Sequence, residues 1–250
     1  MPNIDINCDM GESFGLWNMG NDEDVMPFVT SANIACGFHA GDPETMLKTI
    51  RLAIANNVEI GAHPGLPDLQ GFGRRTMVMT NEEIYGLLVY QIGALQAFAK
   101  TQGRKLHHVK THGALYNMSV LDFNIALAVA KAVHDVDSSL QMYVANANMV
   151  NAGLEYGMNV KFEVYADRSY QDDGTLTPRS QPQALIEDLD KAVRQVKSMV
   201  IDGTVTALSG KSVPIKADTL CIHGDQPGAA IFARQIHAAL RAEGITINST

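Results

Sequence analysis

A unit that recurs along the chain constrains the fold most: an apolar segment, a glycine turn that carries a polar side chain, and an amphipathic helix. Residues 31–43, S-A-N-I-A-C-G-F-H-A-G-D-P, are the clearest copy. Ser31–Cys36 is small and apolar enough to be a buried strand, and the two glycines that follow permit a tight turn. Asp42 can cap the next helix, and Pro43 suits its first position. The segment therefore predicts a strand that exits at His39 and leads into a capped helix.

The same order of elements predicts seven strands. They are Asn3–Cys8, Ser31–Cys36, Val58–Ala62, His107–Thr111, Gln141–Ala145, Val160–Ala166 and Thr219–Ile222. Helices are predicted near residues 44–57, 80–100, 120–136, 149–156, 184–201 and 228–243, with minor strands within 204–215. Alternation of this kind implies a parallel sheet with right-handed crossovers, either open or closed. Polar residues at nearly every strand exit favour a barrel, whose strands all end at one mouth. We predict an α/β fold, a seven-stranded parallel β/α barrel forming a single domain over residues 1–250.

Composition narrows the possible partners. Acidic residues outnumber basic ones by 27 to 19, which argues against nucleic acid or an anionic membrane as a partner. No apolar run approaches the roughly 20 residues that span a bilayer, and the N-terminus does not resemble a signal peptide. The three cysteines lie in strand-like runs, which favours core positions in a reducing compartment. We expect a soluble cytoplasmic protein.

Polar side chains gather at the predicted strand exits. They are Asp9 and Glu12, His39 and Asp42, His63, His112, Asp167 with Arg168, and His223 with Asp225. Any one of the four histidines could simply bond a loop. Four on one rim would instead converge in a pocket.

Such a pocket has several possible chemistries. Imidazoles can act as bases, acids or metal ligands, and Asp9 or Glu12 could orient a histidine, activate water or bind a metal. If a divalent metal is present, Asp9, His39 and His63 are the expected ligands, although no H-x-x-x-H on one predicted helix and no C-x-x-C motif supports one. One of the loop arginines could hold a substrate carboxylate: Arg74, Arg75, Arg168 or Arg179.

One other catalytic motif is excluded. The G-K-S at residues 210–212 lacks the glycine five positions earlier that a phosphate loop needs, since Val205 stands there, and an extended segment follows it.

Seven segments resemble the LamB/YcsF family, the A subunits (PxpA) of 5-oxoprolinase. They are D-I-N-C-D-M-G-E-S-F-G at 5–15, residues 31–43, I-G-A-H-P at 60–64, P-D-L-Q-G-F-G-R-R at 67–75, H-G-A-L-Y-N at 112–117, A-D-R at 166–168 and H-G-D-Q-P-G at 223–228. The likeness covers nearly the whole chain. Thr111 departs from it, standing where the family pattern has proline.

The resemblance implies the opening of the 5-oxoproline lactam to L-glutamate, with ATP as co-substrate and two partner subunits, PxpB and PxpC. It implies catalytic roles for Asp9, His39, His63 and His112. Substrate binding is expected from Asn7, Glu12, Asp42, Arg74, Asp167, Arg168, His223 and Asp225. Because no phosphate loop is visible, we expect the partners to phosphorylate the lactam and this chain to deliver water, with Asp9 or His112 as the base.

The family fold is similar to that of polysaccharide deacetylases, which implies a further test. Those enzymes carry two adjacent aspartates after the first strand, and here Met10 replaces the second, a metal ligand. Either Glu12 supplies the missing oxygen or no tightly held metal is needed, and we favour the second alternative. Two rival functions remain: a stand-alone metal-dependent carbohydrate deacetylase or amidohydrolase, and a non-catalytic subunit that binds the lactam or holds the complex together.

Overall fold

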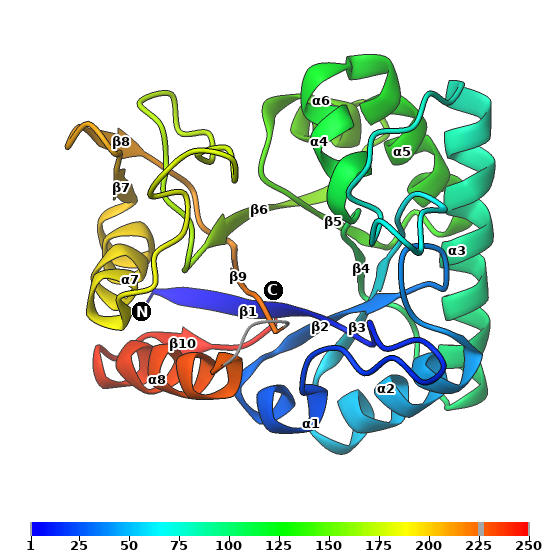
Figure 1. The fold of residues 1–250 in the computed structure, drawn as a ribbon, viewed down its shortest axis with the longest axis horizontal. Helices are drawn as coiled ribbons and strands as arrows, with labels where there is room; N and C mark the ends of the chain where they lie inside the picture. Colours follow the sequence, from blue (N-terminus) through cyan, green and yellow to red (C-terminus); the bar gives the residue numbers. More distant parts are fainter. Residues whose placement is uncertain (1, 225–227, 250) are drawn as a thin grey trace.

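A closed barrel of seven parallel strands forms the centre of the computed structural model, which describes residues 2–224 and 228–249 (Figure 1). In order around the barrel these are β1 (Asn3–Met10), β2 (Ser31–Ala35), β3 (Glu59–His63), β4 (His108–Val109), β5 (Gln141–Val144), β6 (Asn159–Tyr165) and β9 (Thr219–Ile222). Strand β9 pairs in parallel with both β6 and β1, which closes the barrel. The predicted seven-stranded parallel β/α barrel is confirmed.

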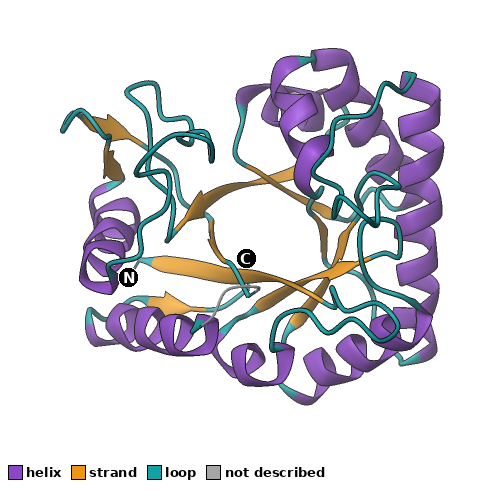
Figure 2. Ribbon diagram, in the orientation of Figure 1, coloured by secondary structure: helices purple, strands orange, loops and turns teal. Residues whose placement is uncertain are grey.

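Helices surround this barrel on the outside (Figure 2). The longer ones are α2 (Pro43–Ala55), α3 (Asn81–Thr101), α4 (Gly113–Leu121), α5 (Phe123–Val136), α6 (Ala147–Glu155), α7 (Leu189–Lys197) and α8 (Ala229–Ala242). Short turns of helix occur at α1 (Asp22–Val25), Met26–Phe28 and Ser198–Asp202. None of the helices in the described part of the chain is long and apolar enough to cross a membrane.

Local sequence explains where two of these helices begin. The Asp42 carboxylate accepts a hydrogen bond from the Thr45 amide and caps α2, whose first residue is a proline. Thr80 and Glu83 form the predicted capping box at the start of α3.

Three minor strands lie outside the barrel. Strands β7 (Thr204–Thr206) and β8 (Ser212–Pro214) form an antiparallel hairpin, as expected for this stretch, and β10 (Thr246–Ile247) pairs with the start of β1. The G-K-S segment lies at the turn of that hairpin, not between a strand and a helix. This setting agrees with its rejection as a phosphate loop.

Two helix boundaries were wrong. The helix expected from residue 120 is preceded by α4, which begins directly after His112, and the two helices are separated by Asp122, the cap of α5. The helix expected from residue 184 begins at Leu189, because the preceding residues are held in a loop. The amide of Ile186 bonds the Asp167 carbonyl there.

The apolar core lies between the barrel and the helices, and the inside of the barrel is polar. Along β1 the apolar side chains of Ile4, Ile6, Cys8 and Met10 join the core. The alternate residues, Asp5, Asn7 and Asp9, bond side chains of other strands. This follows from the two-residue period of a strand. The three cysteines are buried and unpaired in disulfides, as predicted.

Candidate functional site

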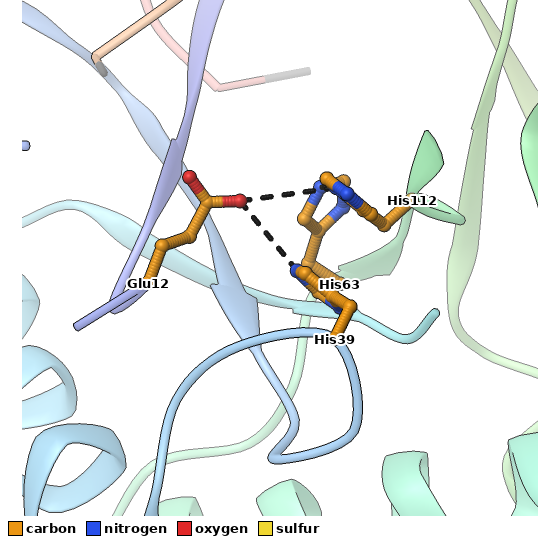
Figure 3. A group of neighbouring side chains, drawn as sticks. All are labelled: Glu12, His39, His63 and His112. Carbon is orange, nitrogen blue, oxygen red and sulfur yellow. Dashed lines mark hydrogen bonds and ion pairs between the residues drawn. The ribbon is translucent and has the colours of Figure 1, made fainter. Parts of the chain in front are cut away.

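Four buried side chains meet at the C-terminal ends of the first four strands: Glu12, His39, His63 and His112 (Figure 3). We call them the histidine cluster. Their ligand atoms all lie within 4.8 Å of one another. In Figure 3 the Glu12 carboxylate points toward His39 and His112, at 3.5 Å and 3.8 Å from their nearer ring nitrogens. The predicted convergence of these exit residues is therefore observed.

Backbone carbonyls determine which nitrogen carries the proton in two of these rings. Nδ1 of His63 lies 2.7 Å from the Lys110 carbonyl oxygen, and Nε2 of His112 lies 2.8 Å from that of Phe72. A carbonyl only accepts, so these nitrogens are assigned as the donors. The remaining nitrogens, Nε2 of His63 and Nδ1 of His112, lie 2.9 Å apart, where a proton on either of them would bridge the two rings. Burial and the neighbouring His63 lower the pKa of His112 to about 3, consistent with a neutral ring.

His39 completes the cluster from the loop after β2. Its ring stacks on His112 with centroids 3.7 Å apart, and neither ring nitrogen makes a hydrogen bond to a described residue. Burial lowers its pKa well below the ordinary value. Glycine is required opposite it: a Cβ on Gly65 would lie 2.6 Å from Nδ1, and Gly73 has a φ of +61° and would meet the His39 Cβ at 2.7 Å.

The donor set of the histidine cluster fits a divalent transition metal. Three imidazoles and a carboxylate are suitable ligands, and the ring nitrogens of two of them are oriented by backbone carbonyls, as is usual for metal-binding histidines. The oxygen donor of this set is Glu12. Of the expected ligands Asp9, His39 and His63, only the two histidines belong to the cluster, and Glu12 is placed where it could supply the oxygen that Met10 lacks. Met10 itself is buried in the apolar core.

Asp9 belongs to a second polar group beside the cluster. One carboxylate oxygen lies 3.0 Å from the Lys110 ammonium, and the other lies 3.4 Å from His63 Nε2. Burial alone would raise the pKa of Asp9, but His63 and Lys110 outweigh it and hold the pKa well below its usual range. Lys110 also contacts Glu163 at 2.8 Å, and its carboxylate neighbours keep the lysine pKa high despite burial.

Lys110 and Glu163 were not predicted as site residues. The signal for Lys110 was the alternation His108, Lys110, His112, which places three polar side chains on one face of an extended segment. Glu163, on β6, also accepts a hydrogen bond from Tyr165 at 2.7 Å.

A pocket of about 290 Å³ opens beside these groups. Asp9, His63, Lys110 and His112 line the side formed by β1, β3 and the segment after β4. Arg168, Arg179 and His223 line the other, from the segments that follow β6 and β9. We call this second group, with Asp167, the arginine wall. His223 bonds Asp167 at 2.7 Å.

The remaining predicted site residues have different positions. Arg74 lines the pocket, 5.0 Å over the Phe72 ring. Asn7 lies inside the barrel below Asp9, bonded to Asn33 and Thr219. Asp42 caps α2 and accepts a bond from the Gly15 amide, outside this pocket. Two predictions find no direct support there: Arg75 pairs with Asp68 outside the pocket, and Asp225 lies outside the described residues.

Sequence comparison places the whole chain among known proteins. A sequence model described as the LamB/YcsF family matches residues 4–250. The chain is 68% identical over 249 residues to the second of two 5-oxoprolinase A subunits named in Bordetella bronchiseptica, covering 100% of both. It is 55% identical over 250 residues to the 5-oxoprolinase A subunit of Bacillus subtilis, covering 100% of this chain and 97% of that one.

Structural comparison agrees. The lactam utilization protein from Thermus thermophilus superposes with a TM-score of 0.96 at 44% identity, covering 99% of this chain and 100% of that one. A polysaccharide deacetylase from Bacillus cereus shares the fold alone, with a TM-score of 0.50 at 11% identity over 100% of this chain and 92% of that one. With the family match spanning almost every residue, the chain belongs to the LamB/YcsF family.

Proposed function

We propose that the protein is the A component of an ATP-dependent 5-oxoprolinase, which opens the lactam of 5-oxo-L-proline to L-glutamate together with PxpB and PxpC. The observation that carries this proposal is the 68% and 55% sequence identity, over the whole length of the chain, to proteins named as A subunits of 5-oxoprolinase. The site is compatible with it: a small polar pocket with an ionised carboxylate on one side and arginines on the other.

Asp9 is the proposed base. Its carboxylate lines the pocket, and its low pKa keeps it ionised at neutral pH, so it can accept a proton from an attacking water. Lys110 holds one oxygen of Asp9 at 3.0 Å, which leaves the other directed at His63. The histidines of the cluster then polarise the lactam carbonyl or an attached phosphoryl group. Arg74, Arg168 and His223 line the pocket in which the substrate binds, and Asp167 supports this lining through its bond to His223.

The ATP-dependent step is assigned to the partner subunits. No phosphate loop occurs in the sequence, and the described part of the pocket is small for a nucleotide. Phosphorylation of the amide oxygen would make the ring carbon electrophilic. In this proposal the barrel receives the activated lactam and supplies water to that carbon. The ring C–N bond then breaks and its nitrogen takes up a proton to become the amino group of glutamate. The acyl phosphate that remains is hydrolysed by a second water to the side-chain carboxylate and inorganic phosphate.

A metal would be held by the histidine cluster: Glu12, His39, His63 and His112. When bound there, it would supply Lewis-acid polarisation of a carbonyl or phosphoryl oxygen. The observation that favours this occupant is that the backbone carbonyls of Lys110 and Phe72 each hold one ring nitrogen of His63 and His112, which leaves the other nitrogen of each ring directed into the cluster.

The same donor set favours a second candidate function, a stand-alone metal-dependent amidohydrolase or carbohydrate deacetylase. The two candidates differ in what they require. The first requires ATP and both partners, whereas the second requires only this chain and its metal.

Turnover measurements separate them. We expect no conversion of 5-oxoproline by the purified chain with ATP, and conversion to L-glutamate once PxpB and PxpC are added. Conversion of a lactam or an acetylated sugar by the chain alone, abolished by a chelator, would instead support the second candidate. Metal content is measured in parallel for the wild type and for Glu12→Gln, with Glu44→Gln on the exposed surface of α2 as the control.

A further inference from the structure

A hydrogen-bonded chain of three side chains crosses the arginine wall. Nδ1 of His223 lies 2.7 Å from Oδ2 of Asp167, and Nε2 of His223 lies 3.0 Å from an Nη atom of Arg179. A guanidinium only donates, so Nε2 of His223 accepts and its Nδ1 donates to Asp167. His223 therefore holds one tautomer that orients Arg179.

The two arginines of this wall have different partners. The guanidinium of Arg168 is buried and donates to the backbone carbonyls of Thr177 and Ala184. These bonds of Arg168 hold the loop that follows β6. Arg179 lies at the exposed end of the pocket and makes no ion pair with any carboxylate among residues 2–224 and 228–249. Of its five N–H donors, one is directed at His223.

The loop that carries Arg179 is anchored on both sides. The amide of Ser169 bonds the Ala184 carbonyl, and that of Thr177 bonds the Ser169 carbonyl. The ring of His223 stacks against Tyr165 with centroids 5.9 Å apart. An arginine presented by an anchored loop and oriented by a histidine is preorganised, which lowers the cost of ordering it when an anion binds.

We propose that Arg179 is the specificity-determining residue that binds the carboxylate of the lactam substrate, and that Asp167 and His223 are positioning residues that act through it. The inference rests on the proposed function and deepens it by assigning one arginine to one substrate group. A planar guanidinium can form two parallel hydrogen bonds to a carboxylate. The lactam ring would then extend from Arg179 across the pocket toward Asp9 and the histidine cluster. A phosphoryl group could use the same donors, so the test includes it.

The test compares two lactams that differ only in the carboxylate. KM and kcat are measured in the complex reconstituted with PxpB and PxpC, for 5-oxoproline and for 2-pyrrolidinone, which lacks the carboxylate. We expect Arg179→Gln to raise KM for 5-oxoproline by about 10- to 100-fold, the effect of losing a hydrogen-bonded charge partner, and to leave 2-pyrrolidinone unaffected. Arg179→Lys should give a smaller rise, because it keeps the charge but loses the fork. Arg104→Gln, which removes an exposed charge elsewhere, is the control.

The positioning residues are tested by rescue. His223→Leu removes the acceptor for Arg179 and should raise KM more than kcat falls. His223→Gln keeps an acceptor oxygen and should recover part of the affinity.

Three results for Arg179→Gln would overturn the inference. The first is an unchanged KM for 5-oxoproline, and the second is an equal rise in KM for both lactams. The third is weaker inhibition by inorganic phosphate with no change in KM for 5-oxoproline. Binding of the two lactams to the chain alone is followed by ligand-observed NMR, which does not depend on turnover. Inactivity of the wild-type complex counts against the proposed function. Equal binding of 5-oxoproline by the wild type and Arg179→Gln counts against this inference.

Discussion

The two sides of the pocket are built differently. The members of the histidine cluster lie at or within a few residues of the ends of four adjacent strands, and their side chains are at most 7% exposed. The arginine wall depends on the long segment between β6 and α7, which contains no regular helix and is held by the side chain of Arg168. The histidine cluster is held in place by burial, and the arginine wall is held in place by the hydrogen bonds of Arg168.

This difference suits a division of labour. Groups that carry out chemistry must stay within a fraction of an ångström of their working geometry, which buried positions at strand ends provide. Groups that recognise a small anion must remain accessible to it, and an anchored loop provides that. The contrast predicts that changes on the histidine side alter turnover, whereas changes on the arginine side alter affinity.

The largest effect is expected from Asp9→Asn. Loss of a general base lowers kcat by about 100- to 10,000-fold, with little change in KM. Turnover of 5-oxoproline in the reconstituted complex measures it, and circular dichroism checks the fold. Asp173→Asn, on the exposed β6–α7 loop, is the control. Wild-type kcat in Asp9→Asn would remove Asp9 from the chemistry.

The next largest effect is expected in the pH dependence of the free energy of unfolding, through His108 on β4. His108 is fully buried, bonds Asn33 at 2.7 Å, and burial lowers its pKa well below the ordinary value. The unfolded chain takes up a proton at this histidine as pH falls through about 6.5, and the folded chain does not, so the stability is present above that pH and is lost below it.

In the wild type, protonation of His108 in the unfolded chain should lower the free energy of unfolding by about 1 kcal/mol between pH 7 and pH 5.5. His108→Gln, which can still donate to Asn33, should show a correspondingly smaller loss in urea unfolding over the same interval. His134→Gln, at a half-buried position on α5, is the control. An unchanged pH dependence in His108→Gln would show that the folded protein already protonates this residue.

Arg168→Met tests whether this side chain holds the loop of the arginine wall in place. The variant keeps the aliphatic stem but removes the bonds to Thr177 and Ala184, each worth about 1.5–3 kcal/mol locally for a charged donor. We expect faster amide hydrogen exchange within residues 169–187 and a higher KM, with kcat nearly retained. Arg179→Met should leave the exchange rates unchanged. Exchange protection equal to wild type in Arg168→Met would mean that packing, and not this side chain, holds the loop.

The smallest effect is expected from Asp42→Ala. Loss of the N-cap of α2 should lower the free energy of unfolding by about 1 kcal/mol. Because Asp42 does not line the pocket, KM for 5-oxoproline should stay at the wild-type value. A raised KM would support the substrate-binding role first expected for it.

The sequence alone was sufficient for the barrel and for most of its rim. Six of the seven predicted strands are followed by a predicted helix, and parallel strands bring their C-terminal ends to one mouth, so His39, His63 and His112 had to approach one another. Capping signals located the starts of α2 and α3 because they depend only on neighbouring residues. Helix α4 was missed because its N-cap residue, His112, makes no side-chain capping hydrogen bond.

Only the tertiary structure decided which polar groups pair. The contact of Lys110, just after β4, with Asp9 on β1 and Glu163 on β6 depends on barrel register, which local patterns do not contain. The same holds for Glu12, which reaches the histidines from a turn beyond β1, and for Arg179, which reaches His223 across 44 residues. Periodicity determined which side chains face inward, and the closed sheet determined which of them touch.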